Sequence, residues 1–528
     1  MKKYFVLLAF VATTLLAEQR TLMVVSDMHV MDTTLWDISN PQILYHDHKM
    51  PEHSCELWDS AVARILQAKP DILLIPGDLT YNGELLSHQY VASKLALIKA
   101  NGTQVFVIPG NHDVSDPAAR SFKNATTLPA KNLSAEGFAT LYADYGYGNA
   151  VARLDSETDS LSYMAYPTDD IALIALNTNQ SNLNGHQSAG GITAGAMAFL
   201  QQCTERALAD GHTNILLMLH HPVMEHFDGH ARMDKNHIGN QVYGITPLSD
   251  VQEMLTAAHV HAVFSGHAHL HTIAHIGTQN GELYDISTGS LSAYPCPMRR
   301  CTLDTETGEL SIEGEEITIY QNEAYQRDTL LAQGAVNAIT EAIYPRLEDL
   351  SNKINSNIAL KMVFGNAFNN IDKQGLKSLV WQFMGTEIHH ALCALSRGDE
   401  NIYFPNDSAY NAAVGSFYTM ATAFLGMDFQ KAQPILEKFG IVPNLGFTPE
   451  DLFGSIYGNY VTLDEDEVVT PDASCTILSG IKVREQRQIT AIESINNEDV
   501  TTPRKQLRNG RLVIIMGDKT YNVLGQTE

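Results

Sequence analysis

Two short stretches, ILLIPGD at residues 72–78 and VFVIPGNHD at residues 105–113, decide how this chain folds. Each is a run of four apolar residues, rich in β-branched side chains, that ends in Pro-Gly and then in polar residues. Apolar runs of this length with turn residues beside them are typical of strands that are buried on both faces. We therefore expect two buried strands, each of which ends at a polar loop.

Four further runs share this pattern: Leu22–Val25, Ile171–Leu176, Ile215–Leu219 and Ala262–Phe264. Longer segments separate the runs, and residues 55–68 have the apolar spacing of a helix. Strands that alternate with helices predict a layered α/β or α+β domain. We place this domain at residues 18–320.

A second, helical domain is predicted at residues 321–470. The strand signal stops near residue 322, and Ile339, Ile343 and Leu347 recur at helical intervals. Its sequence carries no motif that we can attach to chemistry. We expect it either to cap the cleft and select the substrate, or to support or dimerise the catalytic domain.

The last part of the chain, residues 471–528, is predicted to be a linker with a small β segment. An acidic run at 464–467, which we interpret as a linker, precedes it, and the apolar stretches 512–515 and 521–524 flank Gly-Asp at 517–518. This pattern is typical of a β-hairpin.

The start of the chain has the features of a secretory signal. Met1-Lys2-Lys3 is basic, an apolar run follows to Ala17, and Glu18 comes next. We therefore expect residues 1–17 to be a cleaved signal peptide and the mature protein to be periplasmic or extracellular. No other stretch is long and apolar enough to span a bilayer.

The chain is strongly acidic, with 34 Lys and Arg against 60 Asp and Glu and a formal net charge of -26 over 528 residues. This charge repels nucleic-acid backbones and anionic lipids. We therefore expect no stable nucleic-acid partner, and a polyanionic substrate must be held by local cations such as metal ions.

The six cysteines do not have the CxxC spacing of a structural zinc site. They are compatible with up to three disulfides in an oxidising compartment, and Cys296 and Cys301 are close enough to bridge a hairpin. Pairing cannot be deduced from the sequence, and structural or free thiols are the simpler interpretation.

Polar residues follow five of the six apolar runs immediately. The five clusters are Ser26-Asp27-Met28-His29, Pro76-Gly77-Asp78, Pro109-Gly110-Asn111-His112-Asp113, His220-His221-Pro222 and Ser265-Gly266-His267-Ala268-His269. If the strands are neighbours, the clusters meet at the carboxyl edge of the sheet, where α/β proteins bind ligands. The set offers carboxylate, imidazole and amide ligands and no thiolate, which suits Mn, Fe or Zn in a hydrolytic site.

In order and spacing, these clusters resemble the calcineurin-like metallophosphoesterase superfamily, whose pattern is D-x-H, G-D, G-N-H-[DE], H and G-H-x-H. The resemblance covers about 240 residues. It implies a layered β-sandwich flanked by helices and two divalent or trivalent metal ions. It also implies that a hydroxide bridging the ions attacks phosphorus.

The resemblance implies a role for each residue of the motif. Asp27, His29 and His269 would bind the first metal, and Asn111, His220 and His267 the second, while Asp78 would bridge both. His112 would contact the phosphate together with Asn111 and protonate the leaving oxygen.

Several residues near the motif have simpler interpretations. Successive side chains of a strand point to opposite faces, so only one of His220 and His221 is expected to bind metal, and the family register favours His220. Asp113 is either a turn former or a catalytic partner. We expect five further histidines to be solvated or internally hydrogen-bonded: His226, His230, His237, His389 and His390.

Differences between this sequence and the motifs of particular subfamilies narrow the range of expected functions. The second and third clusters lack the arginines of phosphoprotein phosphatases. Tyr81 occupies the position of the iron-binding tyrosine of purple acid phosphatases, but that family lacks a histidine at the position of His29, so Tyr81 is expected to be a wall residue. The pattern resembles phosphodiesterase-type members, which act on small esters such as nucleotides, cyclic nucleotides or phospholipid head groups.

Three other functions are weighed against a phosphodiesterase: a phosphomonoesterase, a nuclease, and a metal- or ligand-binding protein without turnover. The complete motif argues against lost turnover. The acidity of the chain and its lack of a basic, aromatic-rich strip argue against a nuclease.

Overall fold

A computed structural model describes residues 19–44, 48–124, 126–155, 161–179, 190–224, 226, 248–364 and 372–397. It also describes a few helical residues between 415 and 438 and the backbone of five short strands between 467 and 522. The predicted signal peptide lies outside the described residues.

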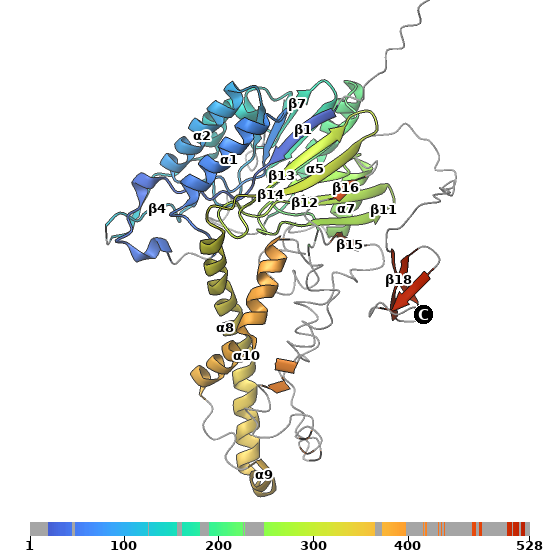
Figure 1. The fold of residues 1–528 in the computed structure, drawn as a ribbon. Helices are drawn as coiled ribbons and strands as arrows, with labels where there is room; N and C mark the ends of the chain where they lie inside the picture. Colours follow the sequence, from blue (N-terminus) through green and yellow to red (C-terminus); the bar gives the residue numbers. More distant parts are fainter. Residues whose placement is uncertain are drawn as a thin grey trace, which may run out of the picture.

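Two β-sheets form the main domain, with helices on their outer faces (Figure 1). The first sheet has six strands in the order β16 (Cys475–Ile477), β14 (Glu309–Glu316), β13 (Pro297–Asp304), β1 (Gln19–Val24), β2 (Ile72–Ile75) and β3 (Gln104–Val107). The second has eight in the order β15 (Glu467–Thr470), β11 (Ile273–Thr278), β12 (Gly281–Ser287), β10 (Ala262–Ser265), β9 (Asn214–Leu219), β8 (Ile171–Leu176), β7 (Tyr163–Thr168) and β6 (Ala152–Arg153). The predicted layered α/β fold is confirmed, and all six predicted strands are present.

Alternation along the buried strands explains why their sequences are apolar at every position. In β8, Ile171 and Leu173 belong to the core between the sheets, whereas Ala172 and Ile174 belong to the core beneath the outer helices. Two helices cover that outer face, α5 (Ala194–Ala209) and α7 (Leu248–Ala257). The first sheet is covered in the same way by α1 (Ser54–Ala68) and α2 (Leu85–Ala100). Both faces of each central strand are therefore dry.

The strands that carry the motif are divided between the sheets, and they are not five neighbours in one sheet. β1, β2 and β3 pair in parallel in the first sheet, whereas β9 and β10 pair in parallel in the second. A run of apolar residues indicates a buried strand but does not specify its partner, so the sequence could not show this division. The carboxyl ends of both sets nevertheless converge on one edge of the sandwich.

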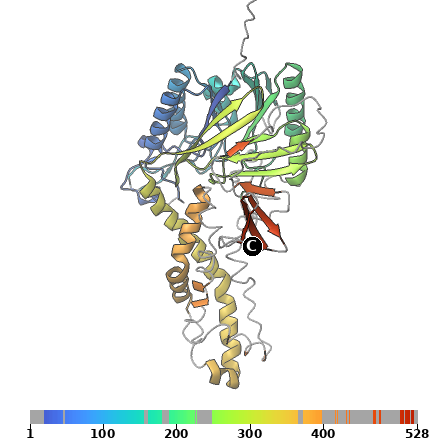
Figure 2. The same cartoon turned by 45° about the vertical axis from the view of Figure 1, so that its right-hand side comes forward.

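A helical hairpin projects from the sandwich in both views (Figures 1 and 2). It consists of α8 (Gln321–Ser356) packed against α10 (Lys373–Arg397), with α9 (Ile358–Phe364) at its far end. Polar contacts hold its base to the main domain, including the ion pair of Arg327 with Glu52 and the contact of His53 Nε2 with Glu323 at 2.5 Å. No helix in the described part of the chain is long and apolar enough to span a bilayer.

The chain returns to the main domain after the helical region. β15 pairs with β11 and β16 pairs with β14, so each sheet gains an edge strand from the last quarter of the chain. Glu467, the end of the predicted acidic linker, is the first residue of β15. The predicted terminal hairpin is part of a three-stranded antiparallel sheet: β17 (Arg504–Arg508), β18 (Arg511–Met516) and β19 (Lys519–Asn522).

No disulfide joins the cysteines whose side chains the structure describes. Cys55, Cys203, Cys296, Cys301 and Cys393 are all buried thiols. Burial raises the pKa of Cys203 to about 12 and that of Cys55 to about 12, which keeps both thiols protonated and unreactive.

Candidate metal centre

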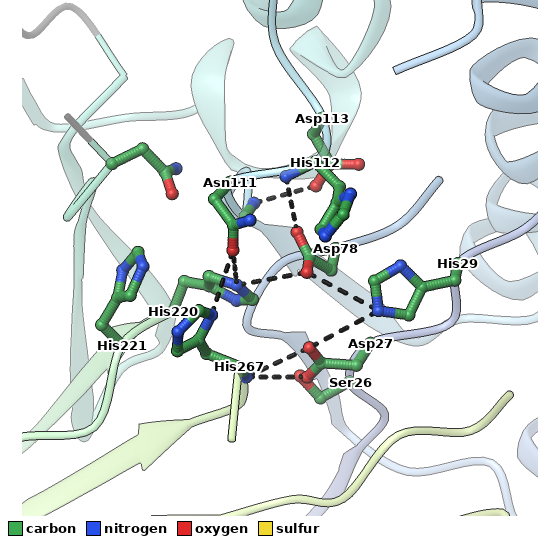
Figure 3. A network of polar contacts seen from close by, with 12 residues as sticks. Ser26, Asp27, His29, Asp78, Asn111, His112, Asp113, His220, His221 and His267 are labelled. Carbon is green, nitrogen blue, oxygen red and sulfur yellow. Dashed lines mark hydrogen bonds and ion pairs between the residues drawn. The ribbon is translucent and has the colours of Figure 1, made fainter. Parts of the chain in front are cut away.

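The loops after β1, β2, β3, β9 and β10 bring all eight predicted site residues together. Figure 3 labels all of them except His269. Asp27, His29, Asp78 and His220 are fully or almost fully buried, and Asn111 is 2% exposed. The residues come from both sheets, so the site lies where the two layers meet. It could not form from either sheet alone.

Five of the predicted ligands have a left-handed backbone. The φ angles lie between 42° and 62° at Asp27, His29, Asp78, His267 and His269. Such a conformation costs about 1–3 kcal/mol at a residue other than glycine. The strain is concentrated on the ligands, and the packed strands on either side maintain it. Such strain indicates a site that is preorganised for a bound group.

Glycines allow the loops to approach one another closely. A Cβ atom at Gly110 would lie 2.2 Å from Asp78 Oδ1, and one at Gly266 would lie 2.4 Å from Asp27 Oδ2. Any larger residue at either position would displace a carboxylate of the site. These two glycines are therefore required by the site rather than by a turn.

The first cluster contains Asp27, His29, Asp78 and His269. The two imidazoles face each other with 3.1 Å between their Nε2 atoms, and His269 Nε2 lies 3.3 Å from Asp27 Oδ1. His29 Nε2 lies 3.6 Å from Asp78 Oδ2. Ligand atoms about 2.1 Å from one ion lie roughly 3.0–3.4 Å apart in octahedral or tetrahedral geometry. The first two separations fall within this range and the third exceeds it by 0.2 Å, so the cluster can hold one metal ion.

The second cluster contains His220, His221 and His267, with the amide oxygen of Asn111 between two of them. Asn111 Oδ1 lies 3.1 Å from His220 Nε2 and 3.0 Å from His267 Nδ1. His220 donates its other ring hydrogen, on Nδ1, to the carbonyl oxygen of Pro76 at 2.8 Å. This bond fixes the tautomer that leaves Nε2 as a ligand, an arrangement common among metal-binding histidines.

Asp78 lies between the clusters. The same oxygen, Oδ2, is 3.6 Å from His29 Nε2 and 3.4 Å from His220 Nε2, while Oδ1 accepts a hydrogen bond from the His112 amide at 2.9 Å. One carboxylate oxygen therefore faces both candidate metal positions. This is the geometry expected of a bridging ligand.

The pKa shifts of three histidines also fit a metal centre. Burial, together with the nearby Lys49 ammonium, holds the pKa of His29 well below its usual range, and burial does the same for His267. Burial opposes charge on His220, but the Asp78 carboxylate outweighs it and raises the pKa of His220 to about 9. Because metal ions compete with protons for such ligands, a cation beside Asp78 would take the place of this proton.

His221 differs from expectation, because it lies with His220 and His267 rather than on the opposite face. Its Nδ1 atom is 2.7 Å from Thr178 Oγ1, and its ring is 4.2 Å from that of His267. Strand β9 ends at Leu219, so the alternation of side chains no longer applies at residues 220 and 221. Gly190 leaves room for the ring, since a Cβ there would lie 2.2 Å from it.

Asp113 is a structural residue. Its carboxylate accepts four hydrogen bonds, from the amides of Leu79, Thr80 and Gly110 and from the Thr80 hydroxyl, at 2.8–3.1 Å. Burial and the neighbouring Asp78 raise the pKa of Asp113 to about 7, against the effect of these donors. Asp113 thus ties the loop after β3 to the loop after β2 and holds Asn111 and His112 in place.

The other residues considered from the sequence have structural surroundings. Tyr81 packs in a small apolar cluster with its ring 6.2 Å from that of Phe122. His226 is buried with Nδ1 2.7 Å from Thr272 Oγ1, and His389 bonds the Tyr325 carbonyl at 3.1 Å. His230 and His237 lie outside the described residues.

Three side chains of the site were not predicted from the sequence. Asn82 accepts a hydrogen bond from His112 Nδ1 at 2.8 Å, His48 Nε2 lies 2.8 Å from His269 Nδ1, and Lys49 Nζ lies 3.4 Å from His112 Nε2. Asn82 is four residues after Asp78 and could have been suspected. His48 and Lys49 belong to a long connection before α1 that has no motif, so no sequence signal identified them.

A family model and several solved structures are similar to this chain. The family model described as calcineurin-like phosphoesterase matches residues 20–271. A search of curated proteins found no match. Solved structures similar to this chain include a dimetal phosphatase from Danio rerio, at 13% identity over 57% of this chain and 97% of that chain, with a TM-score of 0.38. They also include the purple acid phosphatase PPD1 from yellow lupin (Lupinus luteus) seeds, at 12% identity over 57% and 52% with a TM-score of 0.35. A third is PhoD, at 10% identity over 56% and 65% with a TM-score of 0.34.

Proposed function

We propose that residues 20–271, which form a calcineurin-like phosphoesterase domain, hydrolyse phosphoric esters with two metal ions. The observation that carries this proposal is the position of Asp78 Oδ2, which faces a ligand cluster on each side. Mn, Fe and Zn all suit such carboxylate and imidazole ligands. Two bound ions would supply a bridging hydroxide at neutral pH and would hold the oxygens of the phosphate.

The protein's own residues support this chemistry. His112 projects beside the ligands with its ring centroid 5.0 Å from that of His29. Because Nδ1 donates to Asn82, Nε2 is the ring atom through which His112, in its imidazolium form, would protonate a leaving oxygen. The Asp78 carboxylate holds the His112 backbone amide, so the bridging ligand and the proton donor keep a constant separation.

Phosphodiesters are the first substrate class that we propose, because the motif resembles phosphodiesterase-type members and lacks the arginines of phosphoprotein phosphatases. Phosphomonoesters are the alternative. Small esters such as nucleotides, cyclic nucleotides or phospholipid head groups suit a protein whose net charge of -26 disfavours long polyanions.

Removal of metal is the direct test of the proposal. Chelation followed by desalting is expected to abolish hydrolysis of bis(p-nitrophenyl) phosphate and p-nitrophenyl phosphate, and added Mn²⁺ should restore it. Metal content should approach two ions per chain at full activity. A protein that binds two ions and turns over neither ester would instead support a binding role or a more selective substrate.

We also propose that the protein acts after export, on the evidence of the basic and then apolar start of the chain. N-terminal sequencing of the protein recovered from outside the cytoplasm should begin at Glu18. Recovery of the intact chain, starting at Met1 in the cytoplasm, would contradict this part of the proposal.

A further inference from the structure

Lys49 lies in the site but belongs to none of the motif clusters. Its side chain is 6% exposed, and its Nζ atom is 3.4 Å from His112 Nε2. The Met50 amide donates to the Ser292 carbonyl at 2.8 Å and anchors the backbone beside it. The lysine is therefore held in place and is not a surface side chain that reaches the site by chance.

Within the part of the chain that the structure describes, the ammonium of Lys49 has no anionic partner. Among the described residues no carboxylate pairs with it, and its one hydrogen-bonding contact is to a histidine. The carboxylates nearest the candidate metals, Asp27 and Asp78, belong to the first ligand cluster. Burial of a cation without a counter-ion costs several kcal/mol, and two metal ions nearby would add to the repulsion.

An anion that enters the site would relieve this cost, and the position of Lys49 indicates which anion. In the proposed function the Nε2 atom of His112 protonates the oxygen that leaves phosphorus, and the Lys49 ammonium lies 3.4 Å from that Nε2 atom. A group that offers one oxygen to His112 can offer a second, non-bridging oxygen to Lys49. Phosphoryl oxygens have this arrangement, and lysine is a common point-charge ligand for them.

We propose that Lys49 is a substrate-binding residue whose ammonium contacts a non-bridging oxygen of the scissile phosphate, on the same side as His112. This inference rests on the proposed phosphoesterase function and adds to it a positive group beside the two metals and the proton donor His112. The contact is made by substrate and by the inorganic phosphate product alike, so it is expected to affect affinity more than the chemical step.

The test compares Lys49→Met, which keeps the length of the side chain and removes its charge, with Lys49→Arg in the full chain loaded with Mn²⁺. Lys49→Met should raise KM for p-nitrophenyl phosphate and for its bis-ester by about 10- to 100-fold, the loss expected for one charged hydrogen bond. The dissociation constant of inorganic phosphate, read from its effect on thermal unfolding, should rise by a similar factor. Lys49→Arg should restore part of the lost affinity, both in KM and in the dissociation constant of phosphate.

Lys99→Met is the matched control, because it removes the same charge from an exposed ion pair with Asp144 at the carboxyl end of α2. It should leave KM and phosphate affinity unchanged. Equal phosphate affinity in wild type and Lys49→Met would overturn the inference, whatever happens to kcat. If wild type binds phosphate through Lys49 but hydrolyses neither ester, the phosphate contact of Lys49 stands, while the proposed hydrolysis, and with it the assignment to a scissile phosphate, fails.

Discussion

Asp78→Asn is expected to lower kcat/KM for ester hydrolysis by roughly a thousandfold or more, because the stabilisation that a metal pair supplies amounts to several kcal/mol. Oδ2 of Asp78, a member of the first cluster, lies 3.6 Å from His29 Nε2 in the same cluster and 3.4 Å from His220 Nε2 in the second, so one oxygen faces both clusters. Asparagine keeps the shape of the side chain but removes the charge that holds two cations close together. Metal content should fall below two ions per chain, as measured by inductively coupled plasma mass spectrometry.

The control for this variant is Asp71→Asn. Asp71 directly precedes β2, at the end of the strand that lies away from the site, where its carboxylate accepts from the Thr21 amide at 2.7 Å. The same chemical change there should leave metal content and turnover near wild type. An Asp78→Asn protein that retains two ions and activity within tenfold would show that Asp78 does not bridge.

His112→Ala is expected to lower kcat by about 10²- to 10⁴-fold for diphenyl phosphate without loss of metal, since this range is typical of a positioned general acid. The ring is held by Asn82 and is not among the residues of either ligand cluster. The loss should be smaller for bis(p-nitrophenyl) phosphate, because p-nitrophenolate leaves with little need of a proton. Rates for the two esters, measured side by side with metal content, separate acid catalysis from damage to the metal centre.

His275→Ala provides the comparison for His112→Ala. His275 lies on β11 and pairs with Glu282 at 2.9 Å, away from the loops that carry the ligands. Its removal should change neither rate. If His112→Ala slowed both esters equally and lost metal, His112 would be a structural support of the centre, and another group would have to protonate the leaving oxygen.

The predicted strands and clusters were found because their signals are local. A strand buried on both faces needs an uninterrupted apolar run, as at Ile171–Leu176, and a metal ligand needs a nitrogen or oxygen directly after the strand that positions it. Strand β17, with the sequence RKQLR, was missed because it carries three basic residues in five and no β-branched side chain. Its pairing with β18 outweighs that weak propensity.

The roles of Asp113 and His221 depend on partners that the sequence does not specify. Asp113 follows the His112 general acid and could have been its catalytic partner, but its carboxylate turns to amides of the loop after β2. His221 would point away from the site if β9 continued through it, but the strand ends two residues earlier. In both cases the direction of the side chain follows from the conformation of a loop. The periodicity of apolar residues in the sequence does not predict that conformation.

The sequence by itself determined the layered α/β class, six central strands, the helical region that follows them and the ordered set of ligands from Asp27 to His269. Each of these features is encoded by residues that are close together in the sequence. A buried strand needs a run of apolar residues, and each set of ligands comes from one loop. Only the tertiary structure decided that the ligands come from two sheets, that one oxygen of Asp78 faces both clusters, and that Lys49 lies buried beside His112. These features depend on distances between residues far apart in the chain, and such distances are decided by packing of the whole domain.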